Sequence, residues 1–224
     1  MRVAATAKPA AELAAPPAGF SFGNAQVNGT SLHYVRGGQG PAVILIHGFP
    51  EDRVEYRAIM SRLAQRFKVV AVDVPGIGGS APANGGFDTA NLAAHIHGLA
   101  EALNLERPYV VGHDLGGHVT YAYVRRFPDA LRGVMILDVP MPGLAGADEG
   151  VSGLWHIGFI QAPGLTEKMV PGRQDASRLQ TFVEGYRAEG MSHVEGEHIP
   201  GAGHYVVADN PQAVADLIER YGGR

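Results

Sequence analysis

Four short, almost continuously apolar runs, separated by stretches of helical length, constrain the fold of this chain more than any other feature. The runs are AVILI, KVVAV, PYVV and GVMIL, at residues 42–46, 68–72, 108–111 and 133–137. A continuous apolar run is typical of a strand that is buried on both faces of a sheet. Such strands alternating with helices predict an α/β fold, a doubly wound and mostly parallel sheet with crossover helices on both faces.

The segments between the apolar runs carry a helical pattern. Their apolar side chains recur along one helix face in three segments, at residues 55–67, 87–105 and 117–127. Asp88 or Thr89 is placed to cap the second helix. Before the first apolar run, residues 20–38 contain two short strands around an Asn-Gly pair, which is a strong signal for a β-hairpin.

Composition narrows the class of protein. The chain has 224 residues, enough for one domain with a substantial core, and 46% of them are apolar. The net charge of −4 gives no basic footprint, so a nucleic-acid partner is not expected. No run approaches the roughly 20 apolar residues of a membrane span, so no membrane partner is expected either.

Metal and cofactor chemistry is also not expected. The chain has no cysteine, which excludes disulfides, thiolate metal sites and cysteine nucleophiles. Its ten histidines are scattered, and no HExxH motif is present. The predicted partner is therefore a small-molecule substrate, with no metal and no cofactor.

Residues 1–19 are rich in Ala and Pro and lack the apolar core of a signal peptide. They are predicted to form a disordered tail. The expected location is the cytoplasm, and export directed by a signal upstream of residue 1 stays an open alternative.

The turn GHDLGG, at residues 112–117, joins an apolar run directly to a helical segment. Small residues on both sides of a central residue are typical of a nucleophile elbow, in which the central side chain projects above the sheet edge. That central residue is Asp114. The competing interpretation is that Asp114 caps the following helix, a common position for aspartate.

Three other turns favour the catalytic interpretation. HGFP, at residues 47–50, places the Phe49 amide near the sheet edge, where it can donate to an oxyanion. GAGHYV, at 201–206, presents His204 in a loop of small residues after a predicted strand at 195–200. DVPGIGGS, at 73–80, is a Gly-rich loop, but it lacks the pattern of a phosphate-binding loop.

Through these four motifs, taken in order, the chain resembles the α/β-hydrolase family over roughly residues 20 to 221. Aspartate at the elbow narrows the resemblance to epoxide hydrolases and hydrolytic dehalogenases. The resemblance implies that Asp114 attacks a saturated carbon and forms an ester, which water activated by His204 then hydrolyses. It also implies Asp138 as the acid that orients His204, and an oxyanion hole formed by the amides of Phe49 and Leu115.

The resemblance favours an epoxide as substrate. Haloalkane dehalogenases carry Asn and Trp where this chain has Phe49 and Leu115. Fluoroacetate dehalogenases carry arginines at the two positions where this chain has Leu115 and His118. Segments 153–165 and 182–190 instead resemble the cap of one epoxide-hydrolase branch, which implies His156 and Tyr186 as donors to the ring oxygen. The remaining residues expected to bind substrate are Trp155, His113 and His118.

The chain is short for this family, with only 90 residues (204 − 114) between Asp114 and His204. Residues 20–140 and 191–224 are expected to form the core, and 141–190 a reduced, truncated helical cap. A penultimate core strand and its helix are expected to be missing, which exposes a sheet edge and makes a homodimer an open alternative. A dehalogenase, and an inactive or ligand-binding relative, stay open as alternative functions.

Overall fold

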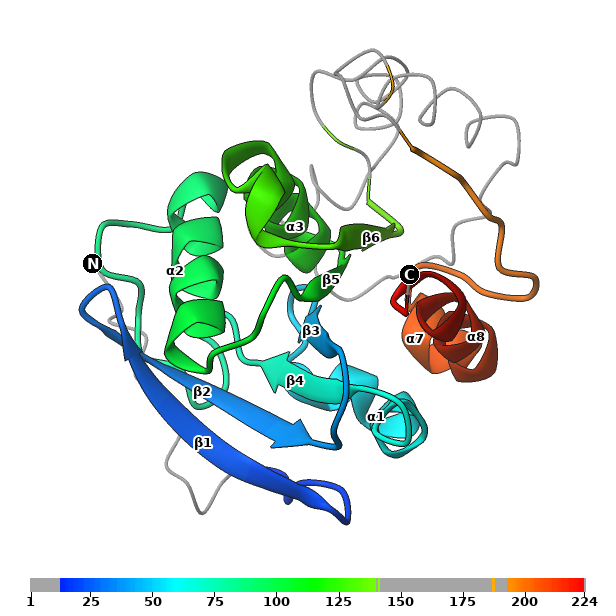
Figure 1. Ribbon diagram of the computed structural model, residues 1–224, viewed down its shortest axis with the longest axis horizontal. Helices are drawn as coiled ribbons and strands as arrows, with labels where there is room; N and C mark the ends of the chain where they lie inside the picture. Colours follow the sequence, from blue (N-terminus) through cyan, green and yellow to red (C-terminus); the bar gives the residue numbers. More distant parts are fainter. Residues whose placement is uncertain (1–12, 140, 142–186, 188–192, 224) are drawn as a thin grey trace, which may run out of the picture. The chain divides into compact units, whose positions relative to one another are not determined.

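The computed structural model describes residues 13–139, 141, 187 and 193–223 (Figure 1). The chain divides into two compact units, one of residues 1–139 with 211–224 and one of residues 140–210. The predicted division into a core of residues 20–140 and 191–224 and a cap of residues 141–190 stays a prediction.

A six-stranded sheet is the centre of the first unit, with the strand order β1-β2-β4-β3-β5-β6. The pairs β4–β3, β3–β5 and β5–β6 are parallel, whereas β1–β2 and β2–β4 are antiparallel. This confirms the predicted α/β fold with a mostly parallel sheet. The strands are β1 (Phe20–Val27), β2 (Thr30–Gly37), β3 (Ala42–Ile46), β4 (Lys68–Val72), β5 (Tyr109–His113) and β6 (Gly133–Leu137).

Helices follow the parallel strands. They are α1 (Arg57–Leu63), α2 (Thr89–Ala102), α3 (Leu115–Arg126) and α8 (Pro211–Tyr221), with 3-10 turns η2 (Arg53–Tyr56) and η3 (Pro128–Ala130). Asp88 caps α2 as predicted, because its carboxylate accepts from the Asn91 amide at 2.9 Å. The first helix is shorter than predicted, because Asp52 caps a separate 3-10 turn before it.

The alternation of side chains along the strands divides the core between two faces of the sheet. On one face, Ile44, Ile46 and Val72 belong to an apolar cluster that includes residues of α2 and α3. On the opposite face lie α1 and α8 (Figure 1), joined by hydrogen bonds from the Arg62 guanidinium to the Glu219 carboxylate. The apolar runs are therefore covered on both sides, as their continuous hydrophobicity requires.

The segment before β1 is more ordered than predicted. Residues 13–19 are described, and the carbonyl oxygens of Ala14 and Ala15 accept hydrogen bonds from the guanidinium groups of Arg53 and Arg57. The predicted disordered tail at residues 1–19 is thus too long at its C-terminal end. Residues 1–12 lie outside the described residues.

The strand predicted at residues 195–200 does not form, and that prediction is wrong. These residues have no regular secondary structure, and all of them except the half-buried Ile199 are exposed. A strand requires a hydrogen-bonding neighbour, and within the described part of the chain the sheet ends at β6. In the second unit, the short helix α7 (Val206–Asp209) follows this segment.

No helix among the described residues is both long enough and apolar enough to span a bilayer.

Candidate active site

Asp114 lies at the tip of a sharp turn between β5 and α3, with backbone angles φ +47° and ψ −116°. Such angles cost a non-glycine residue about 1–3 kcal/mol, so the surrounding structure must hold them. Its side chain makes no capping hydrogen bond to α3. Instead, the Phe49 amide donates to Asp114 Oδ1 at 2.9 Å. The side chain therefore does not act as a helix cap, which was the competing interpretation.

Glycines allow the chain to approach itself closely around this turn. A Cβ atom at Gly112 would lie 2.1 Å from the carbonyl oxygen of Gly116, and one at Gly116 would lie 2.1 Å from that of Ile46. A Cβ at Gly48 would lie 2.9 Å from the Asp114 Cβ. The spacing of small residues recognised in the sequence is therefore a steric requirement of β3, β5 and α3.

Replacing Gly112 by Ala is expected to lower the free energy of unfolding by about 1–3 kcal/mol, because the added methyl group meets the Gly116 backbone, which cannot move aside, as well as the Thr120 hydroxyl. Urea denaturation followed by circular dichroism measures the change. Gly133→Ala in β6 is the control, since its methyl group would meet only the Tyr109 ring, at 3.0 Å. Equal losses in the two variants would contradict the steric argument.

The HGFP turn after β3 is fixed by a buried histidine. The Val74 amide donates to His47 Nε2 at 2.9 Å, so the ring proton is on Nδ1, which donates to the Gly48 carbonyl oxygen at 2.8 Å. Both ring nitrogens are therefore occupied by backbone groups. His47 thus connects the turn that carries Phe49 to the loop that follows β4.

The Gly-rich loop after β4 is organised around the fully buried carboxylate of Asp73. This carboxylate accepts from His33 Nδ1 at 2.8 Å, from the Gly79 amide at 2.9 Å and from the Arg53 amide at 3.1 Å. Burial raises the pKa of Asp73, but these hydrogen bonds outweigh it and hold the pKa below its usual value. Asp73 thus closes its own loop by accepting from the Gly79 amide, and it connects this loop to the segment after the HGFP turn by accepting from the Arg53 amide.

His113 precedes the nucleophile position and is only 1% exposed. Its Nδ1 lies 3.1 Å from Glu55 Oε1 and 3.5 Å from Glu51 Oε2. Burial raises the pKa of Glu55, and the hydrogen bond from His113 only partly offsets this. Burial also acts to raise the pKa of Glu51, but His113 and Glu55 outweigh it and hold that pKa below its usual value. His113 Nδ1 thus faces two glutamates inside the protein, and the expected substrate contact of His113 stays a prediction.

These three side chains are also the group in the first unit that could converge on a metal ion, because their ligand atoms lie within 4.8 Å of one another. His113 Nδ1 and Glu55 Oε1 lie 3.1 Å apart, at ion-pair distance, so these groups already face one another inside the protein.

Asp138, Leu115 and His118 lie around the same turn. Asp138 directly follows β6, and the Asp114 amide donates to the Leu137 carbonyl oxygen at 3.1 Å, so the two aspartates end neighbouring strands. Leu115 and His118 are half-buried in the first turn of α3. Burial lowers the pKa of His118, although the Asp114 carboxylate acts in the opposite direction.

His204 belongs to the second unit, where the structure gives its local geometry. Its carbonyl oxygen accepts from the Val206 amide at 2.8 Å, and its ring lies 5.3 Å from that of Tyr205. Asp209 Oδ2 accepts from the Gly203 amide at 2.6 Å and so closes the loop before α7. The other predicted substrate and ring-opening residues lie outside the described residues, at Trp155, His156 and Tyr186.

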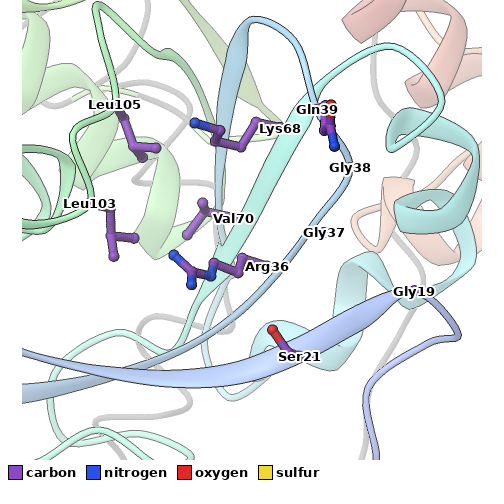
Figure 2. A pocket seen from close by; sticks show the side chains of 10 residues that line it. All are labelled: Gly19, Ser21, Arg36, Gly37, Gly38, Gln39, Lys68, Val70, Leu103 and Leu105. Atoms are coloured by element: carbon purple, nitrogen blue, oxygen red, sulfur yellow. The ribbon is translucent and has the colours of Figure 1, made fainter.

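A hollow of about 430 Å³ lies away from this turn (Figure 2). Figure 2 shows Arg36 and Lys68 beside Leu103 and Leu105 along its lining. Lys68 begins the parallel strand β4, whereas Asp114 follows the carboxyl end of the parallel strand β5. The hollow is therefore at the opposite edge of the sheet from Asp114, and in open α/β sheets ligands bind beyond the carboxyl ends.

The sequence analysis missed Glu55 and the supporting roles of His47 and Asp73. The sequence did contain a signal for Glu55: it is a charged residue between the apolar Val54 and Tyr56, shortly after the HGFP turn. A charged residue in such a setting needs a buried partner or an exposed position. The structure shows the buried partner to be His113, which lies 58 residues (113 − 55) further along the chain.

Comparison with known proteins agrees with this geometry. Residues 41–156 match the model of the family described as alpha/beta hydrolase fold. A soluble epoxide hydrolase from Corynebacterium sp. (strain C12) is 35% identical over 125 residues, which cover 56% of this chain and 43% of that protein. A fluoroacetate dehalogenase from Burkholderia sp. is 29% identical over 190 residues, covering 81% of this chain and 62% of that protein.

Among solved structures, the epoxide hydrolase CorEH, determined without ligand, superposes with a TM-score of 0.52 at 34% identity. The match covers 53% of this chain and 42% of that structure. The chain therefore matches less than half of the length of these epoxide hydrolases and less than two thirds of the dehalogenase.

Proposed function

Because this chain belongs to the α/β hydrolase fold family, we propose that it is a hydrolase that opens an epoxide to a vicinal diol through a covalent ester on Asp114. The hydrogen bond of 2.9 Å from the Phe49 amide to Asp114 Oδ1 is the observation that carries the proposal. In the proposed reaction the second carboxylate oxygen, Oδ2, is the nucleophile. The similarity to proteins named epoxide hydrolases supports the same chemistry.

In the first step, an electron pair of Asp114 Oδ2 forms a bond to an epoxide carbon. The bond from that carbon to the ring oxygen breaks, and the ring oxygen takes a proton from His156 or Tyr186. The product is an ester of Asp114 with a neighbouring hydroxyl group. A carboxylate suits this step because it attacks a saturated carbon and produces an intermediate that water can hydrolyse.

In the second step, His204 takes a proton from water, and the resulting hydroxide attacks the ester carbonyl carbon of Asp114. Negative charge then develops on Oδ1, the atom to which the Phe49 amide already donates, and the Leu115 amide is the second proposed donor. An oxyanion donor of this kind is worth about 3 kcal/mol. The intermediate collapses, the diol leaves with the proton held by His204, and Asp138 keeps the imidazole oriented. Asp114 is left as a carboxylic acid, and its proton returns through water to the residue, His156 or Tyr186, that protonated the ring oxygen.

The alternative is hydrolytic dehalogenation, which uses the same ester. It is supported by the similarity to the fluoroacetate dehalogenase, which extends over 81% of this chain. Against it are Leu115 and His118, which stand where the resemblance to that group calls for arginines. Phe49 and Leu115 likewise lack the side-chain donors that would hold a halide. An inactive or ligand-binding relative is the third candidate.

Replacing His204 by Gln is expected to trap the ester, because alkylation needs no general base and hydrolysis does. The variant is incubated with styrene oxide or with chloroacetate, and its intact mass is measured. An epoxide adds its full mass, since no atom leaves, whereas chloroacetate adds its mass less that of hydrogen chloride. The mass therefore distinguishes the two hydrolase candidates.

A thermal melt followed by circular dichroism accompanies this experiment. A folded His204→Gln protein that gains no mass from either reagent would contradict the covalent mechanism and favour the inactive or ligand-binding alternative. A gain from chloroacetate alone would favour the dehalogenase.

A further inference from the structure

The carboxylate of Glu55 connects the two turns from which the proposed site is built. Its Oε2 accepts from the Gly48 amide at 2.9 Å, and its Oε1 lies 3.1 Å from His113 Nδ1. Gly48 immediately precedes Phe49, and His113 immediately precedes Asp114. One side chain from the 3-10 turn η2 therefore contacts both the HGFP turn after β3 and the elbow after β5.

These contacts close a ring. It runs from Glu55 to Gly48 and Phe49, across the 2.9 Å hydrogen bond to Asp114, and back through His113 to Glu55. The Glu55 side chain is 2% exposed and that of His113 is 1% exposed, so water competes little with these contacts. The hydrogen bond from the Gly48 amide to the Glu55 carboxylate is stronger in such an environment than it would be at a surface.

We propose that Glu55 is a positioning residue, whose buried carboxylate holds the Phe49 amide opposite Oδ1 of Asp114 during ester formation and hydrolysis. This inference rests on the proposed function. Glu51 does not duplicate this role, because it lies further from His113 Nδ1, at 3.5 Å, and is 24% exposed. The raised pKa of Glu55, caused mainly by burial, agrees with a carboxylate that is held in place by the fold and not by solvent.

Burying a carboxylate has a cost that only good partners offset, which suggests why glutamate is needed here. Glutamine has one carbonyl oxygen and one amide nitrogen, so it can accept from either the Gly48 amide or His113 Nδ1 but not from both. The remaining donor would then face the NH₂ group. Glu55→Gln therefore opens the ring at one point while keeping the volume of the side chain.

The test introduces Glu55→Gln into the His204→Gln protein and measures ester formation with styrene oxide by intact mass over time. The maximal first-order rate constant is expected to fall about 10- to 100-fold, while the half-saturating styrene oxide concentration changes little, because alignment is lost and not the binding pocket. A merely structural role would not separate these two quantities.

Asp52→Asn is the matched control. Asp52 caps the same 3-10 turn by accepting from the Val54 amide at 2.9 Å, and it is not a member of the ring. If Asp52→Asn slows ester formation as much as Glu55→Gln does, the effect arises from the turn, and the inference is wrong. An unchanged rate constant in Glu55→Gln also overturns it.

Residue-level amide hydrogen exchange separates failure of this inference from failure of the proposed function. Exchange at Gly48 and Phe49 is expected to be faster in Glu55→Gln than in Asp52→Asn, whether or not an ester forms. If His204→Gln gains no mass, the proposed function fails, and the exchange rates alone decide the role of Glu55. Equal exchange in the two variants would then show that Glu55 does not hold the HGFP turn.

Discussion

Replacing Asp114 by Asn is expected to reduce epoxide turnover by about 10⁴-fold or more, the usual result of removing a catalytic nucleophile. The asparagine side chain has the same shape and keeps a carbonyl oxygen, so it can still accept from the Phe49 amide. It lacks the negative charge that attacks carbon. Diol formation from styrene oxide, measured by chromatography, reports turnover, and the thermal melt is expected to stay close to that of the unmodified protein.

Asp88→Asn is the control for this change, because it makes the same chemical substitution at the cap of α2, away from the proposed site. Its turnover is expected to match that of the unmodified protein. If Asp114→Asn retains more than about one hundredth of the activity while remaining folded, Asp114 is not the nucleophile. Asp114→Ala, which carries neither oxygen, then shows whether the activity that remains in Asp114→Asn depends on the side chain at position 114.

Replacing Asp73 by Ala is expected to cost about 3–5 kcal/mol in the free energy of unfolding, the range for removing one partner of a buried charged network. The change leaves His33 Nδ1 and the Gly79 and Arg53 amides without the acceptor they share. Urea denaturation measures the loss. Asp73→Asn, which keeps one acceptor, is expected to lose less and provides a measurable protein if the alanine variant does not fold.

The pH dependence of stability gives a second test of Asp73. Because folding lowers the pKa of this carboxyl below its usual 3.8, its contribution is fully present above that value and is lost as the pH falls through the lower folded pKa. Between these two pKa values, the unmodified protein should lose stability with falling pH more steeply than Asp73→Asn. Equal slopes, or a loss below about 1 kcal/mol in Asp73→Ala, would contradict the proposed importance of the network.

Prediction from the sequence succeeded where local pattern and burial coincide. The strands from β3 to β6 were identified because each apolar run needs two covered faces, and the helices between them because of their spacing. It failed at residues 195–200, where an extended-looking segment has no strand beside it.

The sequence indicated the turn at Asp114, but it did not predict the buried contacts that surround this turn. The Gly spacing around Asp114 indicated an elbow, since only that local geometry needs glycines so close together. The burial of His113 against two glutamates was not predicted, because it depends on a turn far away in the sequence.

By itself, the sequence of this protein determined the α/β class, the order of its elements and the sharp turn at Asp114, because each follows from hydrophobicity or sterics within a few residues. Only the tertiary structure decided what the Asp114 carboxylate contacts. Phe49 and Asp114 are 65 residues apart and meet because β3 and β5 are neighbours in the sheet. The choice between helix cap and site carboxylate, like the role of Glu55, depends on this strand order, which places separate turns at one edge of the sheet.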